Sequence, residues 1–385
     1  MKFGYFIALY ALDGEPYEDL VDQAIEETQF IEKAGFDAVW LTEHHFGGEG
    51  YDIHPNPIVT GTYLAALTER IRIGLAAVIV PNWHPLRLAE DVAMLDVLSG
   101  GRVECGLGRG ISNREISNLN HFGADRRDSD RNWAYFKEAT EIVKLAWTSD
   151  ALRYKGQFFE FPVPGVKDNY HGWYPRDPRW RAEDGEYIAM DVVPKPLQKP
   201  HPPLWNTVDQ TPGFKVAAEL GLKPISWLRS PRALKEAFEV YRDTASELQG
   251  RELRLGEDCA LLRTCYVAET FEEARAIAEP AIERLYSGYL GGIRGRSIYA
   301  EPGEQHVPDD QPWFDFLYDR KHLLVGTPDM VAERIQELHD DVGLENMLVF
   351  SWLPGITREQ SRASLELFAE QVMPRFTQTP SAVEG

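Results

Sequence analysis

Cysteine is scarce in this chain, and long apolar runs are missing. The 385 residues include three cysteines (Cys105, Cys259 and Cys265) and no CxxC pair. This excludes a disulfide framework, and the apolar runs around Cys105 and Cys265 predict packed thiols. No stretch approaches the 18 apolar residues of a membrane-spanning helix, and the N-terminal residues lack the cleavage site of a secretory signal. These absences predict a cytoplasmic protein.

Positive charge is also in short supply. The chain has 40 basic and 61 acidic residues, for a formal net charge of −21 at pH 7. That field repels the phosphates of nucleic acids and the headgroups of anionic lipids, so neither is expected as a general partner. Any anionic ligand must therefore be held by a local cluster of positive groups.

What the chain does have is a regular alternation of apolar patterns. Short β-branched or aromatic runs are followed by longer stretches with helical spacing, which demands parallel strands with right-handed crossovers. The predicted strands are 2–9, 36–41, 71–80, 102–108, 202–208, 223–228, 259–268 and 345–353, and the predicted helices are 17–35, 57–69, 85–100, 131–147, 212–221, 232–249, 271–287 and 358–372. Eight such units predict an α/β fold, the (β/α)₈ TIM barrel.

Two long segments interrupt this alternation. Residues 154–201 are rich in proline and aromatics, and residues 288–325 are rich in glycine and acidic side chains. Loops of this length are usually lids or binding loops. We therefore predict one barrel domain over 1–376, with an insertion at 154–201, a lid-like loop at 288–325 and a flexible tail at 377–385.

The sequence "WLTEHHF" places Glu43, His44 and His45 directly after the second strand. Reactive residues of a barrel gather at the carboxyl ends of its strands, and an imidazole near neutrality can donate or accept a proton. Two alternatives remain open. One is a histidine satisfied by a backbone carbonyl, and the other is a metal site, because imidazole with carboxylate suits zinc. The additional candidate ligands would be Asp52, His54 and His84.

Two further segments predict an anion site, also at the carboxyl ends of the strands. "GLGRGISN" (106–113) lets backbone amides approach a ligand and offers the guanidinium of Arg109 to a phosphate. "DQTPG" (209–213) opens the fifth helix and could direct free amides at the same anion. The alternatives are a surface arginine on a tight turn and an ordinary helix cap by Asp209 or Thr211. Four aromatic residues at strand ends are expected to face the opening of the barrel at the carboxyl ends of its strands, namely Phe6, Trp205, Trp227 and Trp352.

The chain resembles the bacterial luciferase family of flavin-dependent monooxygenases nearly from end to end. The resemblance is carried by "MKFGYF", "AGFDAVWLTEHHF", "GLAAVIVPNWHPLRLAEDVAMLD", "GGRVECGLGRG", "PKPLQKPHPPLW", "AAELGLKPISW", "VGTPDMV" and "LELFAEQVMPRF". It implies FMN, used in reduced form and delivered by a separate flavin reductase. Molecular oxygen would be the co-substrate, and a flavin hydroperoxide would oxygenate a small, mostly apolar compound.

The resemblance also implies residue roles. His44 is the catalytic residue beside the flavin, and the Ala76-Ala77 peptide is a cis bond that supports the isoalloxazine ring. Arg109 and, after a one-residue insertion, Arg131 match phosphate contacts. The other implied cofactor-binding positions are Ile111, Asp209, Gln210, Gly213 and Trp227. The family commonly dimerises through early barrel helices, so a homodimer is expected.

Two departures from the family limit what the resemblance implies. Gly108 stands where luciferases have a reactive cysteine, and "DQTPG" replaces a Ser/Thr-rich phosphate segment. Long-chain aldehyde oxidation and light emission are therefore not predicted, and the sequence does not choose between Baeyer–Villiger insertion and hydroxylation. A deazaflavin-dependent oxidoreductase of the same fold and a non-catalytic partner subunit are the alternatives. The retained His44 and Arg109 argue against the second.

Overall fold

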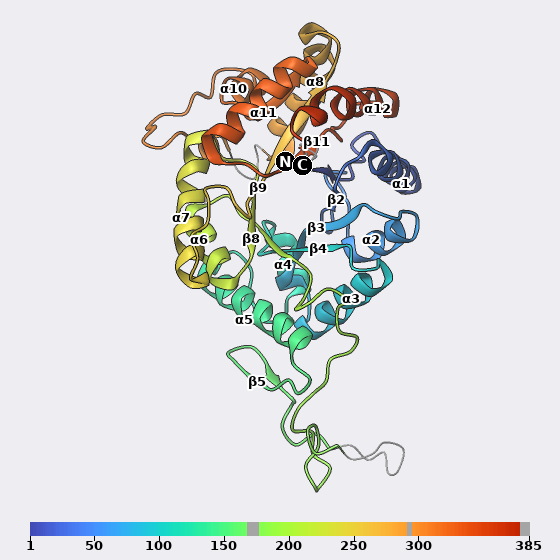
Figure 1. The fold of residues 1–385 in the computed structure, drawn as a ribbon, viewed down its shortest axis with the longest axis vertical. Helices are drawn as coiled ribbons and strands as arrows, with labels where there is room; N and C mark the ends of the chain where they lie inside the picture. Colours follow the sequence, from blue (N-terminus) through green and yellow to red (C-terminus); the bar gives the residue numbers. More distant parts are fainter. Residues whose placement is uncertain (168–176, 291–294, 378–385) are drawn as a thin grey trace, which may run out of the picture.

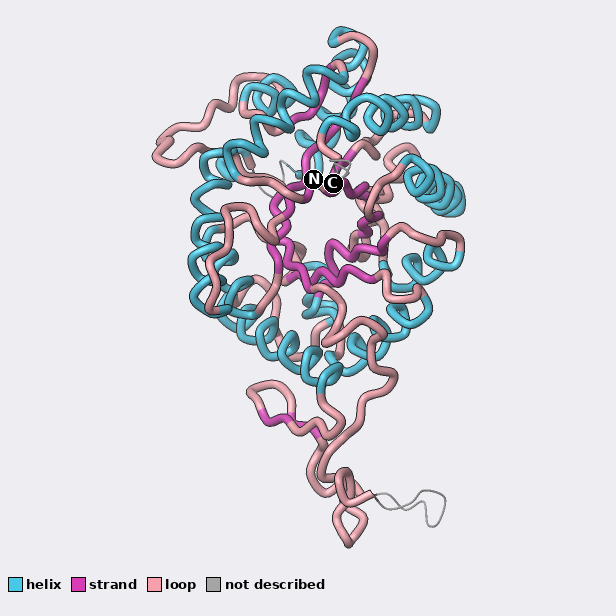
Figure 2. The backbone as a smooth tube through the Cα atoms, in the orientation of Figure 1, coloured by secondary structure: helices cyan, strands magenta, loops and turns pink. Residues whose placement is uncertain are grey.

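The computed structural model describes residues 1–167, 177–290 and 295–377. Eight parallel strands form a closed barrel, visible end-on as the magenta ring in Figure 2. They pair in chain order, and the last strand closes the ring between the seventh and the first. The barrel strands are β1 (Lys2–Ile7), β2 (Ala38–Leu41), β3 (Arg72–Ile79), β4 (Val103–Gly108), β7 (Leu204–Thr207), β8 (Lys223–Ser226), β9 (Ala260–Val267) and β11 (Asn346–Phe350). The predicted TIM barrel is confirmed.

Helices surround the barrel on its outside (Figure 1). Each predicted helix is present, with ends that differ by a few residues: α1 (Tyr17–Ala34), α2 (Pro57–Ala66), α3 (Pro85–Leu98), α5 (Ser129–Thr148), α6 (Thr211–Leu220), α7 (Pro231–Gln249), α8 (Phe271–Leu285) and α12 (Arg358–Leu367). Glycine ends several of them, as at Gly35, where a φ of 97° needs a residue without a β-carbon. Three α-helices in the described ranges were not predicted, namely α4 (Asn113–Leu119), α10 (Trp313–Asp319) and α11 (Pro328–Val342).

The segment predicted as one long loop, 288–325, contains regular structure. A π-helical turn (Tyr286–Leu290), a 3₁₀ turn (Arg296–Tyr299) and helix α10 (Trp313–Asp319) lie within or across it. Strand β10 (Leu323–Gly326) then pairs in parallel with the second half of β9. Residues 291–294 lie outside the described residues. That the segment acts as a lid remains a prediction.

The insertion 154–201 leaves the ring of helices and extends away from the barrel (Figure 1). It begins with a short hairpin, β5 (Tyr154–Lys155) and β6 (Glu160–Phe161). The carboxylate of Glu138 on α5 anchors this hairpin, because it accepts hydrogen bonds from the backbone amides of Gln157, Phe158 and Phe159. Residues 168–176, with Trp173 and Tyr174, lie outside the described residues, as does the tail from 378 on.

No helix in the described ranges is both long and apolar enough to cross a lipid bilayer.

Candidate active site

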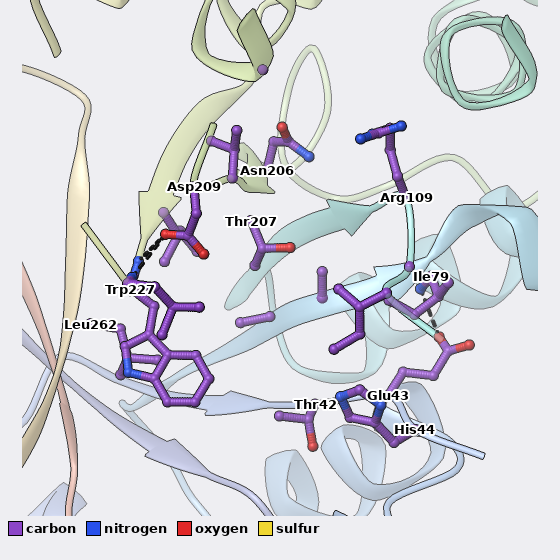
Figure 3. A pocket seen from close by; sticks show the side chains of 18 of the residues that line it. Thr42, Glu43, His44, Ile79, Arg109, Asn206, Thr207, Asp209, Trp227 and Leu262 are labelled. Atoms are coloured by element: carbon purple, nitrogen blue, oxygen red, sulfur yellow. Dashed lines mark hydrogen bonds between the residues drawn. The ribbon is translucent and has the colours of Figure 1, made fainter. Parts of the chain in front are cut away.

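A pocket opens at the carboxyl ends of the barrel strands, and Figure 3 shows part of its wall. It encloses about 1410 Å³ when the space at its opening is included. Its wall contains every predicted site residue except Arg131, namely His44, Ala76, Ala77, Arg109, Ile111, Asp209, Gln210, Gly213 and Trp227.

His44 lies between two carboxylates that come from different segments of the chain. Its backbone amide donates to the carbonyl of His54, which fixes the turn after β2. The ring Nδ1 lies 3.2 Å from Oε1 of Glu115 on α4, and Nε2 lies 3.6 Å from Oδ2 of Asp52. The first contact is a hydrogen bond, whereas the second is an ion pair at a distance too long for a hydrogen bond. The imidazole therefore stands in the pocket wall with an anion on each side.

These carboxylates determine the charge of the ring. Burial lowers the pKa of His44, but Asp52, Glu115 and Glu43 together outweigh it and raise the pKa to about 9. His44 is therefore an imidazolium at neutral pH, and the expectation of a pKa near neutrality was wrong. The neighbouring His54 behaves in the opposite way. Burial and the charge on His44 lower its pKa to about 4, so it is neutral.

Glu43 and His45 support the site from behind. The buried Glu43 carboxylate accepts from the Ile79 amide (2.9 Å), from the Trp83 indole (2.9 Å) and from His45 Nε2 (3.0 Å). Glu43 thereby braces the loop after β3, and His45 turns toward Glu43. Of the two adjacent histidines, His44 is the one in the pocket wall. Among the described residues, no group of three or more His, Cys, Asp and Glu side chains is arranged to hold a metal ion.

The Ala76-Ala77 peptide is cis, as the resemblance implied, and both residues line the pocket. The register between β3 and β4 shifts between Leu75 and Val78, so the backbone leaves the regular ladder at this point. Glycine at position 106 allows β4 to approach β3 closely at this point. A β-carbon at Gly106 would lie 1.9 Å from the carbonyl oxygen of Leu75.

Two arginines form a positively charged end of the pocket, beside the start of α6. The free amides predicted there are largely absent, because Pro212 has no N–H and the Gly213 amide donates to the carbonyl of Gln210. Arg109 donates to Oδ1 of Asn132 (2.8 Å) and lies 3.5 Å over the indole of Trp133, so it is not a surface arginine. Arg126 also lines the pocket and donates to the carbonyl of Gly110. Helix α6 begins here with Gln210 as its N-cap and without a side-chain cap. The alternative of a cap by Asp209 or Thr211 was therefore wrong.

Arg131 lies outside this pocket. It sits in the first turn of α5, where its Nε donates to the carbonyl of Phe122 (2.6 Å) and its guanidinium lies 5.0 Å over the ring of Phe158. Arg126, in the loop before α5, reaches the pocket instead. The two arginines lie five positions apart in an arginine-rich stretch, and the sequence does not show which of them turns inward.

Asp209 points away from the positive end of the pocket. Its Oδ1 accepts from the backbone amides of Trp227 (2.8 Å) and Leu228 (2.9 Å) and from the hydroxyl of Ser226 (3.1 Å). Figure 3 shows this contact beside the indole of Trp227. The Asp209 side chain therefore fixes the strand-end loop after β8, although the residue itself lines the pocket.

Two of the four aromatic residues predicted at the mouth lie elsewhere. Phe6 and Trp227 line the pocket, with ring centroids 6.4 Å apart. Trp205 is the second residue of β7 and packs edge-on against Trp40 inside the barrel, while its indole donates to Glu104. Trp352 lies past the end of β11 and lines a separate hollow with Leu353 and Ile356. The predictions for Trp205 and Trp352 were wrong.

Three charged residues of the pocket region were not assigned to this site from the sequence. Asp52 was considered only as a metal ligand, and Arg126 not at all. Glu115 stands three positions after Ser112, a pattern typical of a helix start, and the Ser112 hydroxyl does accept from the Glu115 amide. The same pattern gives no sign that the Glu115 carboxylate reaches His44, because that contact joins two residues 71 positions apart in the chain.

The fold and the pocket define a barrel enzyme with a protonated histidine, a cis peptide and two arginines at the strand ends. Comparison with known proteins identifies the family. The family model of the luciferase-like monooxygenases matches residues 1–345 of the sequence, and the chain belongs to that family. The predicted resemblance and the predicted class of enzyme are confirmed.

Two relatives match over nearly their whole length. The oxygenase component of a flavin-dependent trigonelline monooxygenase from Acinetobacter baylyi is 24% identical, over 98% of this chain and 96% of the relative. The alkanal monooxygenase alpha chain of Photorhabdus laumondii subsp. laumondii is 26% identical, over 97% of each chain.

Solved structures share the fold. The oxygenating constituent of 3,6-diketocamphane monooxygenase from Pseudomonas putida, a type II Baeyer–Villiger enzyme in complex with FMN, matches with a TM-score of 0.78 and 23% identity, over 98% of this chain and 100% of that one. An F420-dependent secondary alcohol dehydrogenase matches less closely, with a TM-score of 0.66 and 17% identity, over 98% and 99%.

Proposed function

We propose that this protein is the oxygenase of a two-component system. It would use reduced FMN and molecular oxygen to oxygenate a small, mostly apolar organic compound. The observation that carries the proposal is that His44, the cis Ala76-Ala77 peptide and the two arginines at 109 and 126 line one pocket. The family membership and the relatives named as flavin-dependent or FMN-bound monooxygenases support it.

The residues present fit FMN. Arg109 and Arg126 supply two cations that suit a phosphate, and they lie beside the start of α6. In an acidic protein with a net charge of −21, such a local cluster is what an anionic ligand requires. The methyl side chains of Ala76 and Ala77 are small, so this part of the wall suits a planar ring.

When bound, reduced FMN would supply the electrons with which oxygen is activated. This chain's residues would orient the ring, exclude water and deliver a proton. His44 is suited to the last task, because it is protonated at neutral pH, is oriented by Glu115 and lies in the pocket wall. Proton donation by a positioned group is worth roughly 10²–10⁴ in rate.

The remainder of the wall favours an apolar substrate. It is lined by Phe6 of β1, Ile225 of β8, Trp227 just after β8, Leu262 of β9 and Leu290 of the turn after α8. Leu290 belongs to the segment that we propose as a lid. Relatives named for trigonelline, alkanals and diketocamphane differ widely in substrate, so the compound must be found by experiment.

Two partners complete the proposal. One is a separate flavin reductase, in line with the description of the trigonelline relative as an oxygenase component. The other is a second copy of this chain. Apolar side chains on α2 and α3 are solvent-exposed, including Val59 (65%), Tyr63 (55%), Met94 (49%) and Leu98 (62%), and we propose that they form a homodimer contact.

The test uses the purified protein, FMN, NADH and an unrelated flavin reductase. We expect tight binding of reduced FMN under anaerobic conditions and, with a substrate present, incorporation of one oxygen atom from ¹⁸O₂ into the product. His44→Ala should retain FMN binding and lose oxygenation by about 10²–10⁴. A panel of small ketones, aldehydes and terpenes should reveal the substrate and decide between insertion and hydroxylation.

Replacing FMN by reduced F420 in the same assay tests the alternative. Hydride transfer from F420 to a carbonyl compound, with no oxygen uptake from FMN, would overturn the proposal in favour of a deazaflavin enzyme. Absence of binding to either flavin would point to a non-catalytic subunit.

A further inference from the structure

Arg263 is a buried cation behind the pocket wall. It lies on β9, is 0% exposed, and its Nε has no partner among the described residues. Its Nη1 and Nη2 donate to main-chain carbonyls, those of Trp227, Arg229 (2.8 Å) and its own neighbour Leu262 (3.1 Å). Burial lowers its pKa only to about 10, so it carries its charge at neutral pH. Burying a cation is costly, and this one binds two carbonyls of a single loop.

The same loop is held from its other side by Asp209. The carboxylate accepts from the amides of Trp227 and Leu228. Residues 226–229 thus have N–H groups fixed by an anion on the β7 loop and carbonyl groups fixed by a cation on β9. Arg229 closes the arrangement, because its Nη1 donates back to the carbonyl of Asp209 (2.7 Å).

Trp227 is the loop residue bound by both groups. Asp209 holds its amide and Arg263 holds its carbonyl, so its Cα–Cβ direction is set by two charges of opposite sign. Its indole packs against Phe6 and Phe350 and forms one side of the pocket (Figure 3). Charged hydrogen bonds are stronger than neutral ones, and side chains that line a site must be held closely to act on a ligand.

We propose that Arg263 is a positioning residue. Acting across the 226–229 loop against Asp209, it fixes the Trp227 indole in the pocket wall and thereby sets the shape presented to the bound ligand. The part of this inference that concerns ligand binding rests on the proposed function.

A measurement without flavin tests the position of the indole. The Trp227 component of the fluorescence is the part that Trp227→Phe removes. It is obtained as the difference between the protein with and without Trp227→Phe, in the parent and in each Arg263 variant. Its quenching by acrylamide is then compared between these backgrounds. Arg263→Met removes the charge at similar length, and we expect quenching of the Trp227 component to rise at least twofold. Arg263→Lys keeps the charge but loses the planar fork, and should give an intermediate rise. Unchanged quenching in these variants overturns the proposal.

The quenching of Arg263→Met is compared with that of the parent only if this variant folds. If Arg263→Met does not fold, Arg263→Lys alone provides the test. The matched control is Arg362→Lys on α12, since the Arg362 Nε is also buried without a partner among the described residues and its guanidinium lies over Phe30. We expect no change in the Trp227 component there. An equal rise in the control would show a general loosening of the barrel and would also overturn the proposal.

A double-mutant cycle then tests the consequence for binding. Arg263→Lys should weaken FMN binding about tenfold in the parent and less than twofold in the Trp227→Phe background, because coupled residues are not additive. Equal losses in both backgrounds would show that Arg263 does not act through Trp227. If the parent itself fails to bind FMN, the proposed function fails, while the quenching result still decides whether Arg263 positions the indole.

Discussion

Oε1 of Glu115 lies 3.2 Å from Nδ1 of His44, although the two residues stand 71 positions apart. Glu115 is the third residue of α4, and its carboxylate is buried, with 4% of its side chain exposed. This contact fixes the orientation of the imidazole and, with Asp52 on the far side of the ring, keeps it protonated. The site therefore contains a proton donor before any ligand enters.

Replacing Glu115 by Gln should lower the pKa of His44 from about 9 toward its ordinary value. The amide removes a negative charge and a charge-assisted hydrogen bond, and both stabilise the imidazolium. The pKa can be followed by NMR titration of ¹⁵N-labelled histidine. Glu49→Gln is the control, because Glu49 is exposed and pairs with Arg114. A His44 pKa that stays near 9 in Glu115→Gln would contradict this account.

The same ionisation links stability to pH. The folded-state pKa of His44, about 9, lies above its ordinary 6.5, so His44 contributes its full stabilisation below pH 6.5 and loses it as pH rises through 9. We expect the free energy of unfolding of the parent, relative to His44→Gln, to fall over this window. Urea unfolding at pH 6 to 10 measures the difference. A difference that is constant with pH would argue that the ring is neutral when folded.

The two arginines of the pocket should contribute separately to FMN binding. Arg109→Ala and Arg126→Ala should each weaken binding by about 10- to 100-fold, since hydrogen bonds to a charged phosphate are worth about 1.5–3 kcal/mol. Arg131→Ala is the matched control and should change the dissociation constant less than twofold, because its side chain lies over Phe158 outside the pocket. Fluorescence titration with FMN provides the measurement. The reverse ranking of Arg126 and Arg131 would show that Arg131 is the residue that reaches the phosphate.

Gly106→Ala should destabilise the barrel by about 1–3 kcal/mol or more, as overpacking does. The new β-carbon would lie 1.9 Å from the Leu75 carbonyl oxygen, so the backbone beside Ala76-Ala77 would have to move. Gly48→Ala is the control, because nothing lies within 4 Å of the position that a β-carbon would take there. Chemical denaturation compares the two variants. Equal stability of both would mean that β3 and β4 do not need their close approach at this point.

Leu98→Glu should dissociate the proposed homodimer while leaving the barrel folded. The side chain is 62% exposed at the end of α3, so the charge is tolerated in the monomer but would be buried in the contact. Light scattering after size-exclusion chromatography reports the mass, with Leu248→Glu on α7 as a control of similar exposure, 61%. A dimer that persists in Leu98→Glu would place the contact on another surface.

The order of elements followed from the sequence because each element is specified locally. The apolar spacing of residues 17–35 and the glycine at position 35 determine α1 without reference to the remainder of the chain. The short strand β10 was missed for the same reason. The four residues of β10 carry too little periodicity, and they form a strand only because the end of β9 offers backbone groups for pairing.

The sequence by itself determined the eightfold alternation of strands and helices. It thereby placed His44, Arg109 and the 209–213 turn just after the carboxyl ends of their strands. The tertiary structure alone decided which charges meet. It brought Glu115 and Asp52 to His44, turned Arg126 rather than Arg131 inward, and set the Asp209 carboxylate against the amides of Trp227 and Leu228. Such contacts join loops far apart in the chain, and their geometry depends on how the closed barrel brings its strand ends together.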